Sequence, residues 1–66
     1  TNTIEIISSK RIELIEKNNN LANYLSDQEN SQFTYRLNFN DKGSLEEFKE
    51  KLNNEKNINK INVVFN

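Results

Sequence analysis

The chain has no cysteine, no histidine and no proline, and it has a single glycine among its 66 residues. Without cysteine no disulfide can stabilise the domain, and without cysteine and histidine the usual zinc sites are excluded. Carboxylate oxygens remain as metal ligands, and these suit hard cations such as magnesium or calcium. Because a chain this short buries only about 60% of its unfolded surface, we expect a partner chain to add stability.

The sequence also lacks an excess of charge of either sign. Nine basic and ten acidic residues are interspersed and give a net charge of −1, so no basic stripe is available for a phosphate backbone. There is no apolar run of about 18 residues and no recognisable secretory signal. We therefore expect a soluble domain with no nucleic-acid partner. Because the first residue is Thr1 rather than methionine, we expect a fragment of a longer protein.

Residues 3–8, with the sequence TIEIIS, are rich in β-branched side chains and partly alternate between apolar and polar. This pattern predicts a strand that has Ile4 and Ile6 on one face and Ile7 on the other.

The next segment changes to helical spacing. Ser9 stands where an N-cap accepts a hydrogen bond from free backbone amides, and Ile12 and Ile15 follow three residues apart. The sequence therefore predicts a helix over about residues 9–17. Three asparagines at positions 18–20 compete for their own backbone and suit the end of that helix.

Residues 21–28 admit two interpretations, a continued helix or the first arm of a hairpin. Leu21 and Leu25 would continue the helical spacing, but Asn18 would interrupt the apolar stripe that a buried helix requires. As a strand, the segment would pair with residues 33–39, whose strict alternation is typical of a sheet with one buried face. We favour the hairpin, which gives the chain four strands rather than three.

The hairpin also predicts a register. A loop at residues 29–31, with Asn30 in the left-handed conformation, would place Leu25 opposite Tyr35 and Leu21 opposite Phe39. The apolar residues of both arms would then share the face that the helices cover. The uncovered face is expected to carry Ile7, Tyr24, Arg36 and Val64.

The stretch DKGSLEEFKEKLNNEKN predicts a second helix, which ends near Asn53. Gly43 permits the turn before it, Ser44 is the expected N-cap, and Glu47 three residues later completes a capping box. The closing segment INKINVVFN predicts a last strand.

The predicted order is strand, helix, strand, strand, helix, strand, in one domain over residues 1–66. Two interlocked βαβ units satisfy right-handed crossover connections, so we expect an α+β fold of the ferredoxin-like class, βαββαβ. It would have a four-stranded antiparallel sheet with two helices on one face. The expected core is Ile4, Ile6, Ile12, Ile15, Phe33, Tyr35, Leu37, Phe39, Leu45, Phe48, Leu52, Ile61, Val63 and Phe65.

Three glutamates could be considered as magnesium ligands, namely Glu46, Glu47 and Glu50, because carboxylate oxygens bind hard cations. Lys49 and Lys51 stand among them, however, and alternating charges on an amphipathic helix are typical of its solvated face. We therefore predict no metal site.

Other polar clusters also have structural explanations. Ser8, Ser9 and Lys10 could suggest a nucleophile with a lysine base, but no motif supplies an orienting group or an oxyanion hole. Phe33, Tyr35 and Arg36 could suggest an RNA-stacking strand, but the same aromatic residues are needed for the core. Turn chemistry explains Asp27, Glu29 and Asp41. We predict no enzyme, no catalytic residue and no cofactor-binding residue.

The stretch FTYRLNFNDKGSLEEFKEKLNNEKNINKINVVF resembles the C-terminal cytoplasmic domain of MgtC/SapB-type, magnesium-transport-related bacterial membrane proteins. In these proteins an aromatic-led strand, a turn, a helix of the form sLeEL and a closing strand occur in the same order. The resemblance covers about half the chain and implies an ACT-like domain. The chain departs from amino-acid-binding ACT domains, because its turn IISSKRIEL lacks the glycine that lets backbone and ligand approach closely.

The resemblance implies a non-enzymatic regulatory or dimerisation module of a bacterial, transport-related membrane protein. The domain would lie on the cytoplasmic side of the inner membrane and reach the membrane only through upstream segments. We expect a homodimer formed through a sheet edge or through the open sheet face, because uncovered β surfaces favour pairing. The alternative is a small-ligand or cation sensor that binds its ligand between protomers.

Overall fold

The computed structural model describes residues 1–65, which form a four-stranded antiparallel sheet with two helices. The predicted α+β class and the predicted hairpin are therefore confirmed. The strands are β1 (Asn2–Ser8), β2 (Leu21–Asp27), β3 (Gln32–Phe39) and β4 (Ile58–Val64). The helices are α1 (Glu13–Glu16) and α2 (Lys42–Lys51), and the short 3-10 helix η1 (Leu52–Asn54) follows α2.

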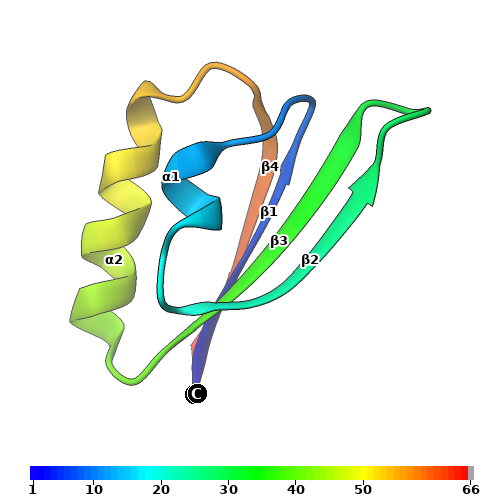
Figure 1. Cartoon of the computed structure of the whole chain (residues 1–66). Helices are drawn as coiled ribbons and strands as arrows, with labels where there is room; N and C mark the ends of the chain where they lie inside the picture. Colours follow the sequence, from blue (N-terminus) through cyan, green and yellow to red (C-terminus); the bar gives the residue numbers. More distant parts are fainter. Residues whose placement is uncertain (66) are drawn as a thin grey trace.

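The strands lie in the order β2-β3-β1-β4, and every neighbouring pair is antiparallel. The two strands that flank the first helix in sequence, β1 and β2, are thus separated by β3, and β4 lies beside β1. Figure 1 shows both helices on the same side of the sheet. It also shows the tip of the β2–β3 hairpin extending away from the helices.

The core lies between the sheet and the helices. Alternate residues of β1 and β3 point into it, and α2 contributes Phe48, whose ring lies 5.6 Å from that of Phe39. All eleven buried apolar residues belong to the expected core. Ile61 and Val63 are partly buried, but the prediction is wrong for Phe65, which is 42% exposed because it follows the end of β4.

The register of the hairpin differs from the predicted one. Leu25 lies opposite Thr34, Leu21 lies opposite Leu37, and the pairing shifts between Leu21 and Asn23. This bulge inserts one residue, which exchanges the two faces for the remainder of β2. Leu25 is therefore 63% exposed on the uncovered face.

Tyr24 accordingly lies on the covered face and not, as predicted, on the open one. It is directly opposite Tyr35, and the two rings stack with centroids 4.9 Å apart and planes inclined by 10°. The bulge thus replaces a leucine by a tyrosine at the border of the core.

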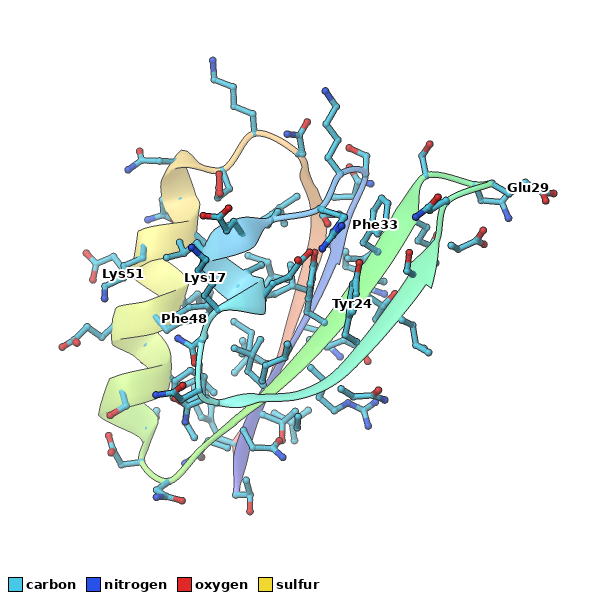
Figure 2. The ribbon with its side chains drawn as sticks, viewed as in Figure 1. Lys17, Tyr24, Glu29, Phe33, Phe48 and Lys51 are labelled. Carbon is cyan, nitrogen blue, oxygen red and sulfur yellow. The ribbon has the colours of Figure 1, made fainter. Side chains whose placement is uncertain are left out.

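The loop of the hairpin is fixed by Asp27. Its carboxylate accepts hydrogen bonds from the backbone N–H of Asn30 at 3.2 Å and from the Asn30 side chain at 2.8 Å. The predicted left-handed residue was Asn30, but Ser31 adopts this conformation, with φ of 50°. In Figure 2, Glu29 lies at the tip of the hairpin, far from the helices.

The first helix is a single turn and begins later than predicted. Its N-cap residue is Ile12, with no side-chain cap, whereas the predicted cap Ser9 makes long-range hydrogen bonds. The Ser9 backbone N–H and its hydroxyl both donate to the carbonyl oxygen of Asn57, at 2.9 and 3.3 Å. This pairing ties the chain to the segment before β4, and residues 9–12 form a bend and an irregular connection rather than helix.

A buried hydroxyl joins this short helix to the sheet. Tyr35, from β3, accepts a hydrogen bond from the backbone N–H of Ile12 at 3.0 Å and donates one to Glu16 Oε2 at 2.6 Å. Arg11 donates to both carboxylate oxygens of Glu16, at 2.8 and 3.2 Å. Burial and the Glu16 hydrogen bond raise the pKa of Tyr35 to about 12, so the hydroxyl remains protonated and able to donate.

The second helix begins with a different cap from the predicted one. The Asp41 carboxylate accepts hydrogen bonds from the backbone N–H of Ser44 at 2.7 Å and from its hydroxyl at 2.9 Å. The expected cap Ser44 and the turn residue Gly43 therefore lie inside the first turn. These bonds, the backbone bond foremost, hold the pKa of Asp41 below its usual range.

Replacing Tyr35 by phenylalanine tests the link between α1 and β3. Tyr35→Phe keeps the ring but leaves the buried N–H of Ile12 without its acceptor, so we expect unfolding free energy to fall by about 1–3 kcal/mol. Urea denaturation measures the loss. The control is Tyr24→Phe, which keeps the stacked pair of rings; an equal loss in both variants would contradict the role given to the Tyr35 hydroxyl.

Replacing each of the two candidate caps shows which one operates. Asp41→Ala removes the acceptor of the Ser44 N–H, and we expect the midpoint of thermal unfolding to fall by roughly 5 °C. Ser44→Ala keeps the backbone hydrogen bond and should cost clearly less. Circular dichroism melts compare the two, and the reverse order would support the capping box of the sequence prediction.

Candidate functional site

The structure separates the three glutamates that could have formed a cation site. Glu46 and Glu50 line a shallow concavity of about 290 Å³ together with Lys49 and Asn53. Glu47 lines a different cleft, on another side of α2. Among residues 1–65 no group of three potential metal-ligating side chains comes together.

The serine that ends β1 and the serine that follows it both donate hydrogen bonds to backbone carbonyls. Ser8 is fully buried, and its hydroxyl donates to the carbonyl oxygen of Lys10 at 2.7 Å. Ser9 donates to the carbonyl oxygen of Asn57, as described above. Both hydroxyls thus bind backbone carbonyls, Ser8 locally and Ser9 across the fold, and they do not share a reactive centre.

The aromatic strand and its arginine do not form one surface. Phe33 and Tyr35 are buried under the helices, whereas Arg36 points to the uncovered face and pairs with Glu5 at 3.2 Å. Since an RNA-stacking platform needs exposed rings, the arrangement of these residues is that of a core strand.

A polar cleft of about 260 Å³ opens between α2 and the connection from α1 to β2. The rings of Phe39 and Phe48 contribute to its lining, and the other lining residues are polar. These are Asn18, Asn20, Asn40, Asp41, Ser44, Glu47 and Lys51. The cleft shows which flank of α2 faces the connection from α1 to β2, namely the one that carries Ser44, Glu47 and Lys51.

The uncovered face of the sheet is mainly polar. Thr3 and Asn38 share a hydrogen bond of 3.0 Å, and the Glu5–Arg36 pair lies on the next positions of the same two strands. Val64 is 51% exposed, and like Leu25 it is an isolated apolar residue among polar neighbours. The face therefore lacks the continuous apolar patch that usually marks a large interface.

The two edges of the sheet differ from each other. At one edge β2 is bulged between Leu21 and Asn23, which disturbs the regular pairing that a further strand would need. At the other edge, β4 pairs with β1 without interruption from Lys60 to Val64. We call residues 60–64 the β4 edge. Its one charged side chain is that of Lys60.

Side chains on both faces of the β4 edge have room for a further contact. Ile61 and Val63 face the helices but are only partly buried, and Val64 on the opposite face is exposed. Open backbone groups together with half-buried apolar side chains are the usual basis of strand addition. The sequence predicted pairing through an edge or a face; the uncharged run INVV was the signal that could have named β4.

Comparisons of the chain with protein-family models, with curated proteins and with solved structures found no match. No helix within residues 1–65 has the length and apolarity needed to cross a membrane.

Proposed function

We propose that this chain is a non-enzymatic regulatory and dimerisation module with a ferredoxin-like, ACT-like fold. The strand order β2-β3-β1-β4, with all neighbours antiparallel, supports this fold, because it is the order that two interlocked βαβ units produce. The resemblance of residues 33–65 to MgtC/SapB-type proteins supports a place on the cytoplasmic side of a bacterial, transport-related membrane protein.

The observation that carries the dimerisation proposal is the β4 edge. A regular, nearly uncharged edge strand offers unpaired backbone groups to a second strand, and natural proteins usually protect such an edge with charges, proline or a bulge. Lys60 is the only protection of the first kind on residues 60–64, and the bulge in the pairing of β4 with β1 lies before Lys60.

Dimerisation would also compensate for the small hydrophobic core of the domain. Within residues 1–65, eleven apolar residues form the buried core, and this is a modest core for a chain without disulfides. Association adds burial for Ile61 and Val63 that a single copy does not reach. In a membrane protein, a pair of such domains would couple the state of one subunit to that of the other.

Static light scattering over a concentration series tests dimerisation. The monomer has a mass of 7.8 kDa, and we expect the weight-average mass to rise towards twice that value between micromolar and millimolar concentrations. Mass action should also raise the unfolding midpoint with concentration. A constant monomer mass up to millimolar concentration would contradict the proposal.

A second candidate function is a sensor for a small ligand or cation that binds between protomers. The concavity lined by Glu46, Lys49, Glu50 and Asn53 favours it, because it carries two carboxylates on an open surface that a second copy could close.

Thermal melts with magnesium, calcium or free amino acids test this second function. A ligand that binds only the native state should raise the midpoint, by more than about 10 °C at 100 times its dissociation constant. Glu50→Gln should reduce the response to a cation, whereas Glu47→Gln, on another side of α2, should leave it unchanged. An unchanged midpoint with every compound would remove this function.

A further inference from the structure

We infer that two copies of this chain pair through their β4 edges, antiparallel and centred on Asn62, so that two four-stranded sheets join into one of eight strands. This inference rests on the proposed dimerisation and names its interface and register. It follows from the symmetry of strand pairing, from the position of Lys60 and from the charges on one flank of α2.

Symmetry restricts the possible registers. In an antiparallel pair, directly opposite residues point to the same face of the sheet. A two-fold axis perpendicular to the sheet keeps the helix side of both copies on the same side of the joined sheet. The axis must therefore pass midway between two directly opposite copies of the same residue. An axis between two residues would oppose side chains of different faces. For the β4 edge the candidate centres are therefore Ile61, Asn62 and Val63.

The charge of Lys60 selects among these centres. An axis at Ile61 would make the two Lys60 residues diagonal neighbours on one face of the joined sheet. The residues would be about 7–8 Å apart, and their like charges would repel. An axis at Val63 would pair Ile61 with Phe65, which lies beyond the end of β4.

An axis at Asn62 avoids both problems. It sets Ile61 opposite Val63 of the second copy on the helix side, which covers two half-buried apolar residues. It sets Lys60 opposite Val64 on the other side, where the lysine stem can cover the exposed valine.

One flank of α2 lies towards β4. Leu45 and Phe48 point into the core, and Ser44, Glu47 and Lys51 face the cleft beside α1. At 100° per residue, the flank of α2 opposite that cleft carries Lys42, Glu46 and Lys49. Asn53 of η1 continues this flank, because it lines one concavity with Glu46 and Lys49. The contact of Lys42 Nζ, 4.7 Å from the centre of the Phe65 ring, agrees with this assignment because Phe65 directly follows β4. We call these four residues the β4-side flank.

The β4-side flank has charges that match under the same axis. Helix α2 starts at Lys42, beside Phe65 near the end of β4, and η1 leads back towards Ile58 at the start of β4. Helix α2 together with η1 therefore runs alongside β4 in the opposite direction. Glu46 and Lys49 are midway along the flank, about 8 Å from Lys42 at 1.5 Å per residue. Asn62 is the middle of the β4 edge and lies about 10 Å from Phe65 at 3.3 Å per residue, so the two midpoints lie at similar heights. A two-fold axis at Asn62 therefore brings Glu46 towards Lys49 of the second copy, twice.

These exposed ion pairs are expected to select the register rather than to supply most of the affinity, because surface pairs contribute little individually. Strand hydrogen bonds and the contact of Ile61 with Val63 supply the attraction. A register shifted along β4 would lose the match between the two flanks, so the strand and the helix specify the same arrangement.

A charge exchange on α2 tests the flank. At low ionic strength, Glu46→Lys and Lys49→Glu should each raise the dimer dissociation constant by roughly 3–10-fold, because two attractive pairs become repulsive. The double variant should return to within about twofold of the original value. Sedimentation equilibrium measures each constant. Matched controls are Glu47→Lys and Lys51→Glu, which change the same charges on the cleft side and should have no effect.

Single cysteines test the register, because the chain has no cysteine of its own. At the axis, Asn62→Cys places two Cα atoms about 5 Å apart, within the range of a disulfide, so oxidised glutathione should link the copies rapidly. Lys60→Cys places them four residues out of register, and Leu25→Cys lies on the other edge; neither should link.

The outcomes distinguish this inference from the proposed function. The β4 interface would be wrong, and dimerisation would still hold, if the charge exchange left the dissociation constant of the dimer unchanged. The same conclusion would follow if Leu25→Cys formed the intermolecular disulfide and Asn62→Cys did not. An unmodified chain that remains monomeric would overturn both. Circular dichroism of every variant separates a lost interface from a lost fold.

Discussion

The alternation of side chains along β3 is the constraint on which the rest of the fold depends. Its period of two residues sends Phe33, Tyr35, Leu37 and Phe39 to one face, and each helix reaches the sheet through this row. Helix α2 packs Phe48 on Phe39, and α1 is held by the hydroxyl of Tyr35. Because the chain has no covalent link to compensate, a break in this row would affect both helices together.

Tyr35 shows how such a small core accommodates polar atoms. A buried hydroxyl destabilises the fold unless it is hydrogen-bonded, and this one both accepts from Ile12 and donates to Glu16. Arg11 in turn pairs with Glu16 where water is near, so the carboxylate keeps its charge without being deeply buried. The hydroxyl of Tyr35 therefore adds a polar link to the apolar contact that the short α1 makes through Ile15.

The sequence predicted what periodicity controls and missed what depends on distant contacts or on a single residue. The alternation of residues 33–39 was sufficient for β3, and the row of core residues followed from it. The bulge in β2 was not readable, because one inserted residue leaves the composition unchanged. Asp41 and Ser44 are equally good caps by type, and Ser9 pairs with Asn57, far away in sequence. The uncharged run INVV distinguishes β4 in the sequence, but only the strand order places this strand at an edge of the sheet.

The two edges of the sheet differ in how completely this small domain buries its apolar side chains. The bulge that stacks Tyr24 on Tyr35 also makes β2 a poor template for another strand. The same inserted residue therefore completes the core and protects that edge. Over residues 60–64 β4 has no such interruption, and Ile61 and Val63 remain half-buried beside it. Apolar side chains that a further contact could still bury are therefore concentrated at the β4 edge. A domain built in this way gains most from a partner that extends its sheet, and in the dimer that we propose a second copy would supply both the strand and the matching charges of α2.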